Sequence, residues 1–189
     1  PGNIITDPAG AFTGKRYYKL LYPNGWLPAP KINIPINISG KEYKLTFWYK
    51  SSASWDVPIV MHYWSTTWET LPYPSSPIKT KNGWSYYEFT LPSTYTGSIS
   101  IIKGYPQTDV FIDELRFYPS QSQMTTYTFD PLIGMTSETD VNGKTTYYEY
   151  DGLNRLSVVR NENKDIVKTI CYNYASQQVP CSVGNTACN

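Results

Sequence analysis

A repeat near the C-terminal end of this chain constrains its fold more than any other feature. The segment Tyr127-Thr-Phe129-Asp130-x-Leu132 returns 21 residues later as Tyr148-Glu-Tyr150-Asp151-x-Leu153. The turn residues 141–144 fall on residues 162–165 in the same register, and a third copy begins at Tyr172-Asn-Tyr174. Each unit alternates aromatic and polar residues on both sides of a turn, which predicts a β-hairpin with two distinct faces. One hairpin alone is marginally stable, so such units need neighbours.

These segments resemble the YD repeats of Rhs-type proteins, which are large secreted or surface polypeptides of bacteria. The resemblance is carried by Tyr148, by Tyr150-Asp151-Gly152-Leu153-Asn154-Arg155-Leu156 and by the more divergent copy Phe129-Asp130-Pro131-Leu132-Ile133-Gly134-Met135. It covers roughly residues 124 to 174 and implies a building block, not a chemistry. In that family the hairpins stack into β-sheet shells around a cargo. Two and a half copies would only begin an array or act as a spacer.

Composition favours short strands throughout the chain. Of 189 residues, 15 are Pro, 12 are Gly and 18 are Tyr, and apolar residues do not recur at helical spacing. The net charge is +1 with acids and bases mixed, so no basic patch for nucleic acid or anionic lipid is expected. No apolar run reaches the length of a membrane span, and the N-terminus lacks the pattern of a signal peptide. The chain looks like a piece of a longer polypeptide.

The three cysteines, Cys171, Cys181 and Cys188, all lie in the last nineteen residues. An odd number cannot pair fully within one chain, and one disulfide in an exported protein is the modest interpretation. A zinc site is less favoured, because the single histidine, His62, is far away in sequence.

We expect a domain over residues 1–119, a polar linker at residues 120–123, hairpin repeats over residues 124–175 and a polar tail containing two of the cysteines over residues 176–189. The tryptophans all precede this linker: Trp26, Trp48, Trp55, Trp64, Trp68 and Trp84. Their concentration in the first domain calls for a physical reason.

Alternation along the strands offers one. In residues 45–50, Leu45, Phe47 and Tyr49 share one face, while Trp48 and Lys50 share the other. The same pattern predicts further inward-facing sets: Ile59, Met61 and Tyr63; Tyr87, Phe89 and Leu91; Phe111, Leu115 and Phe117. Val60, His62, Trp64, Trp84, Tyr86, Glu88, Glu114 and Arg116 would then face outward.

Such an outer face has the composition of a sugar-binding surface. The C–H face of a pyranose ring lies on aromatic planes, and its hydroxyls need polar and charged partners. The predicted ligand-binding residues are Trp48, Lys50, His62, Trp64, Trp84, Tyr86, Glu88 and Arg116. Alternatively, loops, the repeat region or a protein partner cover these side chains, since exposed aromatic patches mark protein contacts as readily as sugar contacts.

The order of strands in residues 4 to 119 resembles a galactose-binding-like jelly roll of the carbohydrate-binding-module type. The resemblance is carried by residues 11–20, by residues 43–50 and by the closing strand Val110-Phe-Ile-Asp113-Glu114-Leu115-Arg116-Phe117-Tyr118. The fold class expected for the chain is therefore all-β: a β-sandwich jelly roll followed by an antiparallel β-hairpin repeat region. Likeness of fold does not by itself establish a ligand.

In that family a structural calcium ion often joins the opening loop to the last strand. Carried over to this chain, the resemblance implies Asp113 as carboxylate ligand, with Asp7 and the carbonyl groups of Thr13 and Lys15 nearby. An inward-facing Asp113 would be costly without a cation or several hydrogen-bond donors. The alternative is an Asp113 carboxylate satisfied by backbone amides.

The sequence offers little for catalysis. Glu88 and Glu114 could serve as a pair of acids, but outward acids on a sheet usually form ion pairs with neighbouring bases. Motifs for a nucleophilic serine, a zinc protease or a phosphate loop are absent, and His62 has no fixed partner in sequence. We therefore expect a non-catalytic module that binds a polysaccharide or cell-surface glycan, on a secreted or surface bacterial protein. The alternative is a structural module that packs against other domains of the same long polypeptide.

Overall fold

The computed structural model describes residues 4–20, 31–34, 40–53, 58–64, 67–71, 76–91, 93, 97–102 and 108–173. The described residues form β-strands and no helix, as the composition predicts, and they therefore contain no helix that could cross a membrane. The chain divides into two compact units, residues 1–122 and 123–189, at the predicted linker. The predicted tail over residues 176–189 lies outside the described residues.

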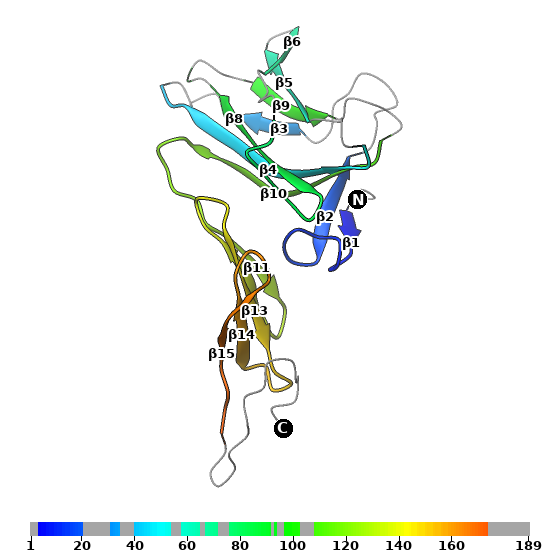
Figure 1. Cartoon of the computed structure of the whole chain (residues 1–189). Coiled ribbons are helices and arrows are strands. Elements are labelled where there is room, and N and C mark those ends of the chain that lie inside the picture. Colours follow the sequence, from blue (N-terminus) through cyan, green and yellow to red (C-terminus); the bar gives the residue numbers. More distant parts are fainter. Residues whose placement is uncertain are drawn as a thin grey trace. The chain divides into compact units, whose positions relative to one another are not determined.

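The first unit contains two antiparallel sheets (Figure 1). The six-stranded sheet has the order β1 (Ile4–Thr6), β2 (Arg16–Leu20), β10 (Val110–Pro119), β4 (Tyr43–Ser51), β8 (Trp84–Leu91) and β7 (Lys79–Lys81). The four-stranded sheet has the order β3 (Lys31–Ile34), β9 (Gly97–Ile102), β5 (Ile59–Trp64) and β6 (Thr67–Thr70). Long crossovers between strands distant in sequence, such as β2 beside β10, tie the two ends of the unit together.

The main core lies between these two sheets, so the unit is a β-sandwich. It contains side chains from both sheets: Leu20, Leu45, Phe47, Tyr49, Val60, Leu71, Tyr87, Phe89, Leu91, Ile99, Ile101, Val110 and Ile112. The inward face predicted for β4 and β8 is confirmed, and the Phe47 and Phe89 rings stack with centroids 5.8 Å apart. On β5 the prediction fails for Val60, which is fully buried in this core instead of facing outward.

A β-bulge in β10 breaks the alternation that the sequence suggested. Asp113 pairs with Trp48, yet Arg116 pairs with Thr46, so β10 uses one residue more than β4 between these pairs. Glu114 takes a positive φ of 51° at the bulge. The prediction that Leu115 faces the core is therefore wrong, because Leu115 is exposed. Arg116 pairs with Thr46, which lies between the core residues Leu45 and Phe47, so Arg116 is on the face opposite the core, but it is buried there and does not reach solvent.

Phe111 was also expected in the core between the sheets. It packs instead on the opposite face of the six-stranded sheet, while its neighbour Ile112 enters the core. Beyond the bulge, Phe117 packs against the core as predicted. One extra residue thus explains why the alternation reads correctly on one side of the bulge and not on the other.

The second unit is a five-stranded antiparallel sheet in sequential order (Figure 1). Its strands are β11 (Thr126–Asp130), β12 (Gly134–Thr139), β13 (Thr145–Tyr150), β14 (Leu156–Arg160) and β15 (Ile166–Thr169). Among its described hydrophobic side chains, only that of Tyr147 is buried. The buried polar side chains of this unit are those of Ser137, Thr139 and Thr145. Cys171, just beyond β15, is disulfide-bonded, as predicted for one pair of cysteines.

Three successive turns of this sheet share one geometry. The side-chain oxygen Oδ1 of Asp140, Asp151 or Asn161 accepts hydrogen bonds from the backbone N–H groups two and four residues later, at 2.8–2.9 Å. The residue three positions later has a positive φ in each turn: Gly143, Asn154 and Lys164. Short Asp and Asn side chains suit this role because they mimic a backbone turn. The aligned positions 143 and 164 of the repeat therefore have the same backbone conformation.

Candidate functional site

A second aromatic cluster covers the face of the six-stranded sheet that points away from the sandwich core. It consists of the buried side chains Phe12, Trp48, Trp84 and Tyr86, with Tyr17 and Phe111 packed against them. The strands place these residues together, since Trp48 on β4 pairs with Tyr86 on β8. The cluster includes three of the predicted sugar-binding residues: Trp48, Trp84 and Tyr86.

The loop of residues 7–15, between β1 and β2, closes this outer face. The Phe12 ring stacks on Trp48, with centroids 3.9 Å apart and planes at 23°, and meets Trp84 edge-on at 6.4 Å. Tyr17 meets Trp84 and Phe111 edge-on from β2. Trp48 and Trp84 are each 2% exposed and Tyr86 is 6% exposed. These rings therefore do not form an open platform for a sugar; the loop covers them, which is the alternative that the sequence left open.

Asp113 fastens this loop to β10. Its Oδ2 accepts hydrogen bonds from the backbone N–H groups of Phe12 at 2.8 Å and Thr13 at 3.1 Å, and its Oδ1 accepts one from the Glu114 N–H at 2.8 Å. Burial raises the pKa of Asp113 to about 6, although the three N–H donors oppose this shift. The carboxylate thus joins two segments about 100 residues apart in sequence.

A buried ion pair lies beside this contact. An oxygen of the Glu114 carboxylate accepts a hydrogen bond from the Thr13 hydroxyl at 2.5 Å, and the other oxygen pairs with the Arg116 guanidinium at 3.0 Å. The Glu114 and Arg116 side chains are only 7% and 2% exposed. The pair therefore lies at the β-bulge, where the Glu114 backbone has a positive φ.

Lysine side chains surround the aromatic cluster. The Lys50 ammonium lies 5.6 Å from the Trp84 ring centroid, and the Lys79 ammonium lies 5.5 Å from Trp48 and 5.2 Å from Tyr86. Lys19 lies 5.7 Å from the Phe111 ring and forms an ion pair with Asp109. Ammonium groups at such distances are attracted by the negative faces of the rings. The rim of the cluster is therefore cationic.

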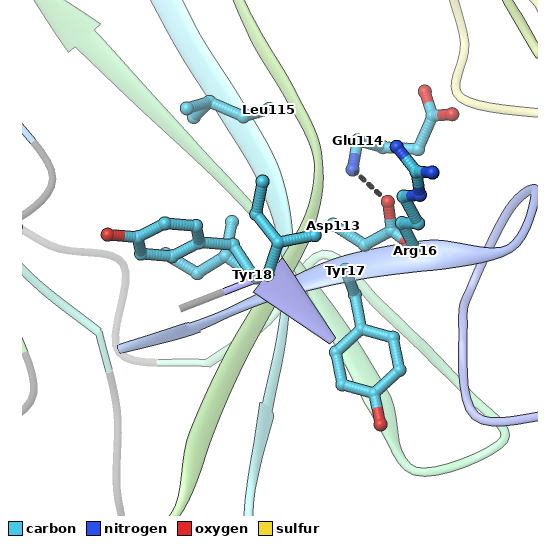
Figure 2. A pocket seen from close by; sticks show the side chains of 8 residues that line it. Arg16, Tyr17, Tyr18, Asp113, Glu114 and Leu115 are labelled. Atoms are coloured by element: carbon cyan, nitrogen blue, oxygen red, sulfur yellow. Dashed lines mark hydrogen bonds between the residues drawn. The ribbon is translucent and has the colours of Figure 1, made fainter. Parts of the chain in front are cut away.

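An open hollow of about 360 Å³ lies at the bulge, between β1, β2 and β10. It is lined by Ile4, Arg16, Tyr17, Tyr18, Ile112, Asp113, Glu114 and Leu115. Figure 2 shows the Tyr17 and Tyr18 side chains on opposite sides of β2, and the bond from the Glu114 N–H to Asp113. Both acids that line the hollow are bonded to their own loop and strand, so the hollow offers a ligand mainly apolar surface.

The predicted calcium ligands do not form a set that fits the ion. Both oxygens of Asp113 face N–H donors, and the Lys15 carbonyl accepts a hydrogen bond from the Asp7 N–H at 2.9 Å. The Asp7 carboxylate accepts a bond from the Ala9 N–H and contacts the Tyr17 hydroxyl. Calcium takes about six to eight oxygen ligands, whereas N–H donors already contact each of these oxygen-bearing groups. The described residues also hold no group of three or more His, Cys, Asp or Glu that could bind a metal ion.

The remaining predicted binding residues divide into two groups. Lys50 lies on the rim of the cluster, Glu88 pairs with Lys44 at 2.7 Å, and Arg116 is buried with Glu114. The side chains of His62 and Trp64 lie outside the described part of the chain, although their backbone belongs to β5. The two acids considered as a catalytic pair, Glu88 and Glu114, are thus each bound to a cation in the chain.

Sequence reasoning missed Phe12 and Lys79. Phe12 belongs to a loop, where alternation carries no information, and it contacts β4 from 36 positions away in sequence. Lys79 lies on β7, a strand of three residues that is too short for a pattern. The sequence did indicate that something covers these residues, because so many aromatic side chains on one exposed face of a sheet are unfavourable in water.

Neither a scan against models of known protein families nor a search of curated proteins finds a match to this chain.

Proposed function

We propose that this chain is a non-catalytic interaction module of a longer exported polypeptide, in which the β-sandwich is a rigid domain and the repeat sheet contacts other parts of that polypeptide. One observation carries the proposal. Among the described residues, most of the large hydrophobic side chains that remain exposed belong to the second unit: Tyr127, Phe129, Leu132, Ile133, Val141, Leu153 and Val167. A sheet with so little buried apolar surface gains stability from further contacts.

The turn leucines provide the sharpest test. Leu132 is 97% exposed and Leu153 is 65% exposed, at aligned positions of the repeat, and the Asn154 side-chain amide donates a hydrogen bond to the Leu132 carbonyl. The two turns are therefore neighbours and present a shared apolar edge. Burial of both leucines in the longer polypeptide would stabilise it by several kcal/mol, at roughly 25 cal/mol per Å².

The experiment compares Leu132→Asp and Leu153→Asp in the longer polypeptide and in this chain alone. This chain should keep its thermal midpoint, because both side chains face solvent. The longer polypeptide should become more sensitive to limited proteolysis near residues 123–173. Thr126→Asp, at the start of β11, controls for added charge. Unchanged proteolysis of the longer polypeptide in both leucine variants would refute the proposal.

The disulfide at Cys171 supports export, because such bonds persist in oxidising compartments. The resemblance to YD-repeat polypeptides and to carbohydrate-binding jelly rolls supports the same setting as an analogy. A surface location on a bacterial cell follows from that analogy and belongs to the proposal.

Glycan binding is the second candidate, favoured by the lysine-rimmed aromatic cluster. In this form of the proposal a sugar ring takes the place of Phe12 on Trp48, and Lys50 and Lys79 meet its hydroxyl groups. A glycan array with the wild-type chain and Phe12→Ala, each with calcium and with chelator, tests it. Selective sugar signal that strengthens in Phe12→Ala supports it, and no signal from either protein excludes this cluster as the site.

A further inference from the structure

The hollow beside the β-bulge leaves part of the core-bearing face of the six-stranded sheet open. Ile4 on β1 and Ile112 on β10 both pair with Tyr18 on β2, so these residues form a row across three strands on one face. Ile112 is buried in the sandwich core and Tyr18 packs against it, whereas Ile4, on the edge strand, is 49% exposed. Leu115, which also lines the hollow, is 40% exposed. The hollow therefore presents apolar side chains to solvent.

A guanidinium group stands at the edge of this apolar surface. Arg16 precedes Tyr18 by two positions on β2, so its side chain leaves the strand on the same face, and it lines the hollow (Figure 2). The two acids of the lining, Asp113 and Glu114, are engaged by hydrogen-bond donors of the loop and of β10. No described residue forms an ion pair or a hydrogen bond with the exposed Arg16 guanidinium. The hollow thus combines apolar walls with one positive charge that can meet an anion.

We propose that this hollow binds a small monocarboxylate with an apolar body, with the carboxylate on Arg16 and the body against Ile4 and Leu115. A guanidinium presents parallel N–H donors that match the two oxygens of a carboxylate. Small-molecule sites of roughly 300–1,000 Å³ are mostly apolar, with a few polar groups that fix the orientation of the ligand. A hollow of about 360 Å³ suits a ligand at the small end of this range. An amine would find both acids of the lining already engaged.

The inference goes beyond the proposed function, because the hollow lies on the sandwich domain and contains none of the turn leucines. It also differs from the glycan candidate at the aromatic cluster. Tyr17, which packs against that cluster, leaves β2 on the opposite side from Tyr18 (Figure 2). The two candidate sites therefore lie on opposite faces of the six-stranded sheet and can be tested with different variants.

Titration of the whole chain with octanoate, followed by the ¹⁵N–¹H signals of the backbone and of the Arg16 Nε–H group, tests the proposal. Octanoate should saturate with a dissociation constant of about 1 mM or lower and should shift the Arg16 signal. Octanamide has the same apolar body without the charge and should bind at least about fivefold more weakly. Acetate has the charge without the body and should not saturate the site at the same concentrations.

The same chemistry occurs at the C-terminal end of a polypeptide, so a second ligand distinguishes the two sources. N-acetylalanylleucine carries an apolar side chain next to a free carboxylate. Binding of this peptide more weakly than octanoate supports a free small acid as the ligand. Binding about tenfold tighter than that of octanoate would overturn this assignment.

Variants separate the two parts of the site. Arg16→Gln should weaken octanoate binding at least about fivefold and leave octanamide binding unchanged. Lys41→Gln removes an exposed cation outside the hollow and should change neither. Leu115→Ala should weaken the binding of both ligands, whereas Ile78→Ala, at an exposed apolar residue outside the hollow, should weaken neither.

Three results would overturn the proposal: no saturable binding of octanoate, equal affinity of the wild type for octanoate and octanamide, or equal losses in Arg16→Gln and Lys41→Gln. Thermal midpoints close to that of the wild type confirm that each variant is folded. If Arg16→Gln unfolds, the comparison of octanoate with octanamide on the wild type still decides the role of the charge.

Discussion

The Phe12 ring lies nearly parallel to the Trp48 indole, 3.9 Å away, and separates it from solvent. This contact joins a loop near the N-terminus to the middle of the six-stranded sheet and gives the sheet a second buried face. The sandwich domain therefore has two apolar layers, one between its sheets and one beneath the 7–15 loop.

Phe12→Ala should destabilise the sandwich domain by about 3 kcal/mol, since it removes a buried ring and leaves Trp48 with no stacking partner from the loop. Tryptophan emission should shift to longer wavelength as Trp48 and Trp84 meet water. Urea unfolding followed by fluorescence measures both effects. Leu132→Ala, at a side chain 97% exposed, should change stability by no more than about 0.5 kcal/mol. Equal effects of the two substitutions would show that Phe12 does not cover the cluster.

Asp113 should make stability depend on pH. Burial raises its pKa from 3.8 to about 6 in the folded chain, so the folded state holds the proton more tightly than the unfolded state. This contribution is fully present below about pH 4 and is lost as pH rises through 6, by up to about 3 kcal/mol. Asn at this position keeps an oxygen for the Phe12 and Thr13 N–H groups and cannot titrate.

The measurement is the free energy of unfolding of the wild type and of Asp113→Asn between pH 3.5 and 7.5. The difference in free energy of unfolding between the two proteins should change between pH 4 and 6 and stay constant below and above this range, because the other groups titrate equally in both proteins. A difference that is constant with pH would mean that folding does not raise the pKa of Asp113.

Removing only one partner of the Glu114 and Arg116 ion pair should lower the free energy of unfolding, whereas replacing both partners should lower it much less. Glu114→Gln leaves the buried guanidinium without a counter-charge and should destabilise the fold by about 3 kcal/mol. Arg116→Met in the same protein should recover much of this loss. Glu88→Gln breaks the half-exposed pair with Lys44 and should cost about 1 kcal/mol or less. Thermal and urea unfolding distinguish these cases, and a double variant no more stable than Glu114→Gln would contradict a buried pair.

The turn at Asp151 should depend on an oxygen at Oδ1 and not on the negative charge. Hydrogen bonds from the Arg155 backbone and side chain lower the pKa of Asp151, yet Asn161 makes the same backbone bonds in the next turn without a charge. Asp151→Asn should therefore keep slow amide exchange at Leu153 and Arg155, and Asp151→Ala should lose it. Equal exchange rates in the two variants would refute the shared geometry of the turns.

How far the sequence determined the fold can be judged from particular residues. Alternation placed Phe47 and Phe89 correctly, because regular pairing of β4 and β8 preserves a period of two. It failed at Phe111 before the bulge and at Leu115 within it but held at Phe117 beyond it, since one extra residue shifts the alternation on one side of the bulge relative to the other. Nothing local in the sequence marks that bulge: Glu114 adopts a positive φ without being glycine or asparagine.

The candidate site was harder to predict than the fold. Alternation correctly grouped Trp48, Trp84 and Tyr86 on one face, but it cannot show whether a loop covers that face. The cover comes from Phe12, and its anchor, Asp113, lies 101 residues later in the chain. The repeat was easier to predict than the site, because its turns form through local hydrogen bonds. Aligned residues such as 143 and 164 therefore adopt the same turn conformation.

Backbone amide exchange at Phe12 and Thr13 in the wild-type chain tests most directly whether the loop closes the aromatic face. Both N–H groups donate to the partly buried Asp113 carboxylate, so both amides should exchange much more slowly than those of an open loop. Asp113→Ala should accelerate both without changing the exchange of core amides such as that of Phe47. Rapid exchange of Phe12 and Thr13 in the wild type would mean that the loop does not cover Trp48 and Trp84, and would restore the open aromatic platform as the candidate site.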